Sequence, residues 1–171
     1  KIELPEESVF YSKDVMNILL IGTDERTELF NKASRSDTMM LISLNKKTHD
    51  VKLVSFERDT YVSLPNRPPQ KLCHAFQFGG AKLVMNTLQS HFSLDVEKYV
   101  RVNFFVFTKL VDEVGGVDID LTEAEANIIA DRTNQITKRG LNHLDGSAAL
   151  CYSRIRVIDS DWERVKRPQN V

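Results

Sequence analysis

The sequence has few of the residues that would indicate a disulfide-stabilised or a low-complexity protein. It contains two cysteines, five prolines and seven glycines in 171 residues, which excludes a disulfide framework and a proline- or glycine-rich low-complexity chain. No run of eighteen apolar residues occurs, so no segment has the length expected of a membrane-spanning helix. Charge of one sign is also missing, with 23 Lys and Arg against 24 Asp and Glu. This balance argues against a protein that binds nucleic acid through its overall charge.

Several catalytic motifs are absent as well. There is no GxGxxG, no GxxxxGK[ST] and no CxxC, so a standard nucleotide loop or cysteine metal site is not indicated. Cys73 is next to His74, but a buried structural cysteine is favoured over a nucleophile because neighbours on a strand point to opposite faces. Cys73 and Cys151 could pair outside the cytoplasm, which the sequence does not decide. The four histidines have no metal-ligand spacing: His49, His74, His91 and His143.

The residues that are present describe a globular protein. With 42% hydrophobic and 27% charged residues, the chain can bury a core, and we expect a single domain over residues 1–171. Short apolar runs predict strands, and residues 38–56 are typical of a hairpin. The expected strands are 17–21, 38–44, 51–56, 99–102 and 117–120, and the expected helices 81–92, 103–114, 122–130, 145–152 and 160–169. This alternation predicts an α/β fold with a partly antiparallel sheet.

Two carboxylates flank a long polar loop, residues 22–37. Asp24 follows the first predicted strand and Asp37 precedes the second. If these strands pair, both carboxylates lie at one end of the sheet. Two carboxylates without a full protein cage suit Mg²⁺, which keeps waters and shares its coordination with phosphate oxygens. The alternative is that each is an ordinary turn residue, which is the commoner role of an aspartate at a strand end.

Arginines form a second group, all near predicted strand or helix ends. Guanidinium groups bind phosphate oxygens through two parallel hydrogen bonds and stay charged, so converging arginines indicate a polyphosphate site. The alternative is a set of exposed salt bridges that contribute little stability. Arg58 favours the phosphate site because it follows an apolar strand instead of lying on a charged helix. The group comprises Arg26, Arg35, Arg58, Arg154, Arg156, Arg164 and Arg167.

Together these segments resemble the LytR–CpsA–Psr family of bacterial cell-wall proteins. The matching segments occur in the family's order over nearly the whole chain: NILLIGTDER (17–26), RSDTMMLISLN (35–45), VSFERDTYVSLP (54–65), KLCHAFQFGGA (71–81), FFVFTKLVDEVGGVDIDL (104–121), LNHLDGSAALCYSRIR (141–156) and DSDWERVKRPQ (159–169). The resemblance implies a central mixed β-sheet flanked by helices, with an apolar pocket for a polyprenyl chain. It also implies transfer of a glycopolymer, such as wall teichoic acid or capsular polysaccharide, from a polyprenyl-pyrophosphate carrier to peptidoglycan through a phosphodiester.

The resemblance also assigns roles to residues. It implies that Asp24 and Asp37 bind Mg²⁺, or Mn²⁺ in its place. The residues implied to bind the pyrophosphate are Arg35, Arg58, Lys71, Arg154, Arg156, Arg164, Arg167 and Gln169. The implied catalytic residues are Arg58, Arg154, Arg156, Asp161 and Arg164, with Asp161 or Asp24 as the acceptor of the hydroxyl proton. One departure is Pro168, where the family usually has a glutamine; proline supplies no side-chain amide and can end the last helix early.

The polyprenyl chain requires an apolar lining. The candidates are Leu83, Val84, Leu88, Phe92, Phe104, Phe107, Leu110 and Val111, each of which could equally be ordinary core. We expect an N-terminal membrane helix outside this sequence and a domain on the extracytoplasmic face of the cell membrane, because family members have this organisation and the chain starts at Lys1 without Met. A non-catalytic lipid-binding domain and a pyrophosphate hydrolase are rival interpretations. A transcription regulator is disfavoured, since no helix-turn-helix pattern or basic face is present.

Overall fold

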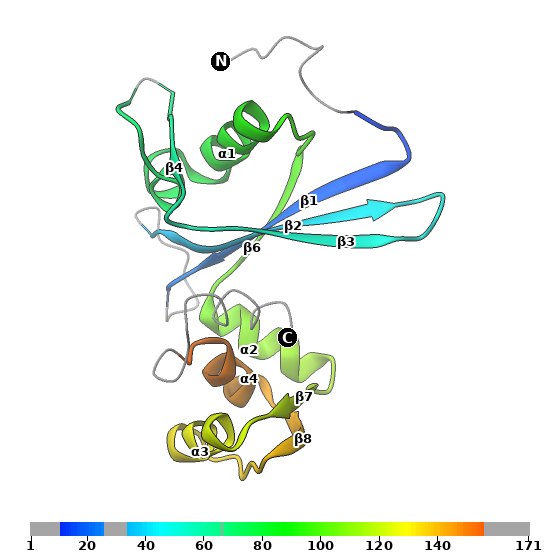
Figure 1. Ribbon diagram of the computed structural model, residues 1–171, viewed down its shortest axis with the longest axis vertical. Helices are drawn as coiled ribbons and strands as arrows, with labels where there is room; N and C mark the ends of the chain where they lie inside the picture. The colour runs from blue at the N-terminus through cyan, green and yellow to red at the C-terminus, as the bar shows by residue number, and fades with distance from the viewer. Residues whose placement is uncertain (1–10, 26–33, 66, 156–171) are drawn as a thin grey trace. The chain divides into compact units, whose positions relative to one another are not determined.

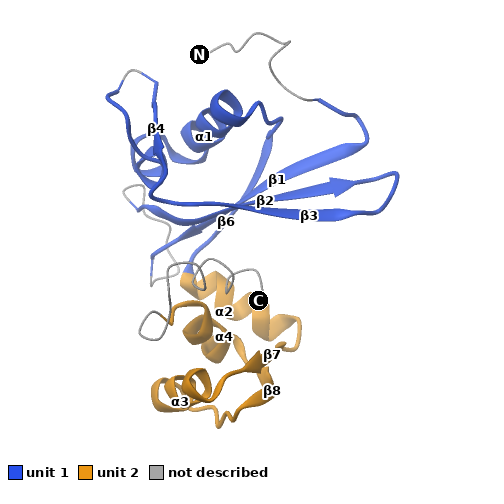
Figure 2. Ribbon diagram, in the orientation of Figure 1, with its two compact units in different colours: residues 1–103 blue, residues 104–171 orange. Residues whose placement is uncertain are grey.

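The structure is a computed structural model that describes residues 11–25, 34–65 and 67–155. The chain divides into two compact units, residues 1–103 and residues 104–171 (Figure 2). We call them the first unit and the second unit. The expectation of one domain over the whole chain stays a prediction.

The first unit is built on a four-stranded mixed sheet (Figure 1). Its strands lie in the order β3-β2-β1-β6, with β1 antiparallel to β2, β2 antiparallel to β3, and β1 parallel to β6. The bounds are Val15–Thr23 for β1, Ser36–Asn45 for β2, Val51–Phe56 for β3 and Lys98–Val102 for β6. The predicted mixed sheet and the predicted hairpin of β2 and β3 are therefore confirmed.

Helix α1, Cys73–Phe92, packs against one face of this sheet. Its backbone leaves the helical region at Gly79 and Gly80, so two helical segments, residues 73–78 and 81–92, meet at the glycine pair. The predicted helix from residue 81 is therefore confirmed, and the helical segment before the glycines was not predicted. The core between helix and sheet is formed by side chains that alternate along β1 and β2 and recur along α1: Leu19, Ile21, Met39, Leu41, Phe76, Val84 and Leu88.

A short antiparallel pair leads from β3 into α1. Strand β4 is Tyr61–Val62 and strand β5 is Gln70–Lys71. The Leu72 amide donates to the Thr60 carbonyl oxygen at 2.9 Å, and the Cys73 amide donates to the Arg58 carbonyl oxygen at 2.9 Å. These bonds fix the residues after β3 against the start of α1. Cys73 is therefore the first residue of a helix, and the expectation that it lies on a strand is wrong.

In the described part of the second unit, residues 104–155, three helices pack with a two-stranded sheet. Its elements are α2 (Phe104–Glu113), β7 (Val117–Leu121), α3 (Glu123–Arg132), β8 (Gly140–Leu144) and α4 (Gly146–Ser153). Strands β7 and β8 are antiparallel. Strand β8 was not predicted, because Gly140 and the polar residues around it indicate a break. The last predicted helix, 160–169, lies outside the described residues.

The helix ends of the second unit follow the sequence signals. The Glu125 amide donates to the Thr122 hydroxyl at 3.3 Å, and the Thr122 amide donates to the Glu125 carboxylate at 2.8 Å, which is the predicted capping box. Asp145 accepts from the Ala148 amide at 2.8 Å and caps α4. Gly115 and Gly116, both with positive φ, follow the end of α2. These expectations are confirmed.

Helices α2 and α4 approach each other closely at Gly146. A Cβ atom there would lie 2.1 Å from the Thr108 carbonyl oxygen, so only glycine fits this position. The Gly146 amide also donates to the Asp112 carboxylate at 2.7 Å. The contact places the beginning of α4 beside α2 and thereby fixes the course of the helix that leads to Arg154.

Candidate active site

The candidate site begins at the end of the β1–β2 pair. Gly22 pairs with Thr38 and Thr23 pairs with Ser36, so the register shifts and Asp37 has no partner across the pair. Asp24 directly follows β1 and is exposed. Because the two strands are antiparallel, both carboxylates lie at the same end of the sheet, as the sequence predicted. An irregularity of this kind changes the direction in which a side chain points.

Arg58 joins Asp37 at this end of the sheet. Its guanidinium donates to Asp37 Oδ1 at 2.5 Å, and the two side chains are 35% and 29% exposed. A second pair lies beside it, with Lys71 Nζ 3.0 Å from Asp59 Oδ1. Asp59 Oδ2 is 3.8 Å from Arg58 Nε. The sequence assigned three of these residues to the site, and the structure places them in one charged cluster of alternating sign.

The charges of this cluster and of Arg35 act on the Cys73 thiol. Burial raises the pKa of the Cys73 thiol, and the Asp59 carboxylate raises it further. The positive charges of Arg58 and Arg35 act on the thiol in the opposite direction. The cysteine is a buried free thiol, which agrees with the structural interpretation and not with a thiolate nucleophile.

The carboxylates fit a hard cation by their chemistry. Among residues 11–25, 34–65 and 67–155, no group of three or more His, Cys, Asp or Glu side chains could hold a metal ion. Two carboxylates with an adjacent arginine suit a cation that completes its coordination with water and phosphate oxygens. Arg58 occupies Oδ1 of Asp37, which leaves the other carboxylate oxygen for such an ion.

Arg154 belongs to the second unit and is held in another way. It is exposed and caps α4, and its amide donates to the Cys151 carbonyl oxygen at 3.1 Å. Its guanidinium lies over the ring of Phe104, 4.3 Å from the centroid. Phe104, which the sequence assigned to the lipid lining, therefore contacts the arginine. The remaining predicted residues lie outside the described ones: Arg26, Arg156, Asp161, Arg164, Arg167 and Gln169.

The other predicted lipid residues are divided between two cores. Val84 and Leu88 are fully buried in the core of the first unit, and Leu83 packs against it. Val111 is buried in the core of the second unit, and Phe107 packs against that core. Phe92 and Leu110 are 45% and 54% exposed. Their role as a lipid lining stays a prediction.

Sequence reasoning missed Arg101, which lies on β6. Its guanidinium donates to the Glu25 carboxylate, to Ser34 Oγ at 2.8 Å and, through Nε, to Thr23 Oγ1 at 3.4 Å. It also lies over the Phe76 ring, 4.8 Å from the centroid. The Arg101 and Glu25 side chains are only 18% and 8% exposed. No local sequence signal marks this residue, because its pairing with Ile21 of β1 is a long-range contact.

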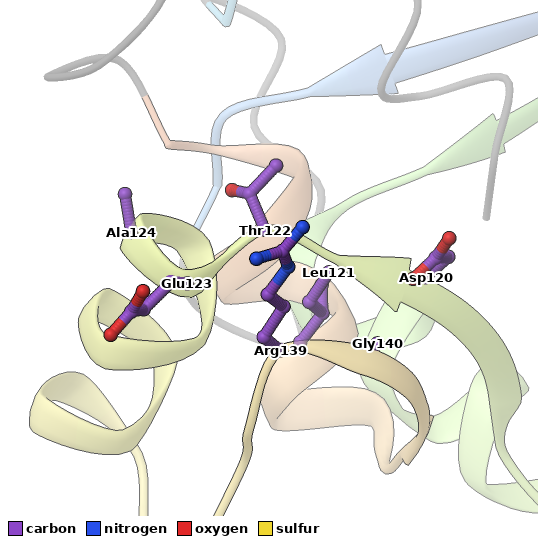
Figure 3. A pocket seen from close by; sticks show the side chains of 7 residues that line it. All are labelled: Asp120, Leu121, Thr122, Glu123, Ala124, Arg139 and Gly140. Atoms are coloured by element: carbon purple, nitrogen blue, oxygen red, sulfur yellow. The ribbon is translucent and has the colours of Figure 1, made fainter.

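Cavities among the described residues include one in each unit. One, of about 530 Å³ and shown in Figure 3, lies between the end of β7, the start of α3 and Arg139. Arg139 extends toward Thr122, while Asp120 lies on the other side of the cavity (Figure 3). The second cavity, of about 370 Å³ in the first unit, is lined by Phe76, Phe78, Tyr99, Arg101 and the α1 kink. None of the predicted site residues lines either of them.

Comparison with known proteins identifies the class. The model of the LytR_cpsA_psr family matches residues 3–171. A protein named polyisoprenyl-teichoic acid–peptidoglycan teichoic acid transferase TagU, from Oceanobacillus iheyensis, is 37% identical over 158 residues, covering 89% of this chain and 47% of its own length. TagT from Bacillus subtilis, with the corresponding transferase name, is 33% identical over 165 residues, covering 93% of this chain and 51% of its own length.

Solved structures that resemble this chain lead to the same family. The structure titled TagT bound to LIIa-WTA has a TM-score of 0.80 at 30% identity, covering 100% of this chain and 64% of that one. TagT with bound octaprenyl pyrophosphate lipid has a TM-score of 0.75 at 28% identity, covering 99% and 65%. The chain belongs to the LytR–CpsA–Psr family and has its fold. It spans about half the length of the curated relatives it matches.

Proposed function

We propose that the protein transfers a glycopolymer of the wall teichoic acid class from a polyprenyl-pyrophosphate carrier to peptidoglycan. The observation that carries this proposal is the charged cluster in which Arg58 contacts Asp37, at the sheet end that also holds Asp24. Relatives named as teichoic acid transferases support the reaction. A relative solved with octaprenyl pyrophosphate supports the carrier.

The reaction needs charge neutralisation and positioning. A hydroxyl of the peptidoglycan sugar attacks the phosphorus attached to the glycopolymer, a new P–O bond forms, and the bond to the bridging oxygen breaks. Polyprenyl phosphate leaves with the electron pair, and the hydroxyl proton passes to a carboxylate or to water. Arg58, Arg35 and Lys71 bind the phosphate oxygens and stabilise the charge that accumulates on them. We assign the same role to Arg154, Arg156, Arg164 and Arg167.

Asp24 and Asp37 would hold Mg²⁺, which supplies positive charge to the phosphate oxygens. Arg58 assists these carboxylates by orienting Asp37 through the 2.5 Å hydrogen bond. Mn²⁺, a hard ion of similar ligand preference, would serve in its place.

The place of action follows from the proposed substrates. A peptidoglycan acceptor and a polyprenyl carrier meet at the extracytoplasmic face of the cell membrane, so the domain works there. Over the described ranges 11–25, 34–65 and 67–155, the helices are too short or too polar to span a bilayer. An anchoring helix elsewhere in the protein remains part of this proposal.

The proposal is tested by incubating the chain with a polyprenyl-pyrophosphate-linked sugar, Mg²⁺ and peptidoglycan fragments. We expect sugar phosphate linked to the fragments and equimolar polyprenyl phosphate. Polyprenyl phosphate without linked product would indicate a hydrolase. Tight binding with neither product would indicate a lipid-binding domain, and either result would reject the transferase function.

A further inference from the structure

We infer that Arg101 is a positioning residue of the candidate site, and that it holds Asp24 and Arg35 in place through the residues beside them. This inference rests on the proposed function, because that function gives Asp24 and Arg35 their roles. Arg101 itself contacts neither of them in the hydrogen bonds described above; its contacts are with Thr23, Glu25 and Ser34.

The contacts of Arg101 fall on residues beside the two candidate site residues, Asp24 and Arg35. Thr23 and Glu25 are the two chain neighbours of Asp24, and Ser34 is the neighbour of Arg35. One guanidinium therefore links both neighbours of Asp24, the proposed metal ligand, to Ser34, the neighbour of Arg35, which is proposed to bind phosphate. Residues 26–33 between them lie outside the described residues. The bonds from Arg101 join the two described ends of this stretch directly.

The side chains that Arg101 contacts are buried. The Thr23 and Ser34 residues are 1% and 8% exposed, and the Glu25 side chain is 8% exposed. Hydrogen bonds to a charged group are strong, and water competes with them least where they are buried. The Phe76 ring covers the guanidinium at 4.8 Å, and β6 fixes the Arg101 backbone against β1. The arginine is thus itself held on several sides.

The contacts at this position require the donor geometry of an arginine side chain. A guanidinium carries five N–H donors in a planar fork, and Arg101 uses Nε and a terminal nitrogen in different directions. A lysine has the same charge but places all its donors on one nitrogen. Arg101→Lys should therefore keep the positive charge beside Glu25 and lose the simultaneous contacts with Thr23 and Ser34.

The test uses the 171-residue chain and three variants. Arg101→Lys is the main variant, and Arg101→Met combined with Glu25→Gln removes the pair without leaving a buried charge alone. Arg67→Gln is the matched control, because Arg67 also covers an aromatic ring, Phe78 at 4.1 Å, but its described contacts do not include Thr23, Glu25 or Ser34. Thermal unfolding first confirms that each variant is folded at the working temperature.

Two readouts follow. Hydrogen exchange of peptides covering residues 19–25 and 34–38 should be faster in Arg101→Lys and in the double variant, with β3 peptides and Arg67→Gln unchanged. The affinity for Mn²⁺ alone, measured by electron paramagnetic resonance, should fall about 10-fold, the lower end of the loss seen when groups that orient metal ligands are changed. Inorganic pyrophosphate affinity should fall with it.

The outcomes separate the two proposals. Unchanged exchange in a folded Arg101→Lys variant, or faster exchange with wild-type affinity for Mn²⁺ and pyrophosphate, would overturn the positioning role. If exchange changes as expected but the wild-type chain binds neither Mn²⁺ nor pyrophosphate, the proposed function fails and the role assigned to Arg101 within that site fails with it, although its hold on the chain stands. Loss of exchange protection together with loss of affinity supports both.

Discussion

Arg58 of the first unit and Arg154 of the second unit are held by different kinds of partner. In the first unit, Arg58 and Arg101 are bound by carboxylates, Asp37 and Glu25. In the second unit, Arg154 lies over the Phe104 ring. A carboxylate fixes a guanidinium and also neutralises it, whereas an aromatic ring orients the cation and leaves most of its charge available. Among the described residues, carboxylates therefore partly neutralise Arg58 and Arg101, whereas the aromatic ring beneath Arg154 does not neutralise its charge.

The largest effect is expected at Arg58. Arg58→Ala should lower product formation by about 10²–10³-fold, because it removes charge stabilisation at the phosphate and releases Asp37. Folding should change by less than about 1 kcal/mol, since the pair is partly exposed. Transfer rates and thermal unfolding check this. Arg139→Ala, an exposed arginine in the cavity of Figure 3, is the control and should retain activity. Full activity of Arg58→Ala would remove Arg58 from the site.

The packing of α4, the helix that ends at Arg154, against α2 can be disturbed by a substitution at Gly146. Gly146→Ala should destabilise the protein by about 2–3 kcal/mol, because the added Cβ would press on the Thr108 carbonyl. Within a helix the same change usually stabilises by up to about 1 kcal/mol, so the sign is diagnostic. Urea unfolding measures it, with the exposed Ser147→Ala variant of the same helix as control. A stabilised Gly146→Ala variant would mean that α2 and α4 are not in close contact.

A substitution of Phe104 tests whether an aromatic ring holds Arg154 in the way that a carboxylate holds Arg58. Phe104→Leu should weaken pyrophosphate binding about 2- to 5-fold, because a cation–π contact at an exposed site contributes about 0.5–1 kcal/mol. Phe104→Tyr should bind normally. Binding titrations in the Arg154→Ala background provide the control, since Phe104→Leu should have no further effect there. An undiminished effect in that background would show that Phe104 acts on pyrophosphate binding independently of Arg154.

The smallest effect is a pH dependence in the second unit. The Asp118 carboxylate, 2.7 Å from His143 Nδ1, raises the pKa of His143 above the ordinary histidine value of 6.5, and the Gly115 carbonyl adds to this. The folded pKa exceeds the unfolded one, so the contribution to stability is complete below about pH 6.5 and is lost as pH rises through the folded pKa. Melting temperatures against pH check this. Asp118→Asn should flatten the profile, and an unchanged profile would contradict the assignment.

Local patterns predicted much of the fold. Apolar runs gave β1, β2 and β3, and the side-chain types at Thr122, Glu125 and Asp145 predicted their caps, because capping depends on residues only a few positions apart. The helical residues before the glycine pair, 73–78, were not predicted, because so short a segment shows little periodicity. Strand β8 was missed because its pairing with β7 is a long-range contact that its own polar residues do not indicate.

The candidate site was predictable only in part. The pairing of β1 with β2 placed Asp24 and Asp37 at one end of the sheet, as expected from their positions beside two apolar strands. Arg101 was missed because its partners are about 70 positions away in the sequence, and nothing local distinguishes it from a surface arginine. Its role depends on the parallel pairing of β6 with β1, which a single sequence does not specify.

The short connection after β6 has a consequence for recombination between relatives. Only Asn103 separates the end of β6 from the start of α2. All the described partners of Arg101 precede this point in the chain, whereas Phe104 and Arg154 both follow it. A chimaera joined at Asn103 would inherit each arginine together with the groups that hold it. A crossover a few residues earlier would combine Arg101 from one parent with Glu25, Ser34 and Phe76 from another.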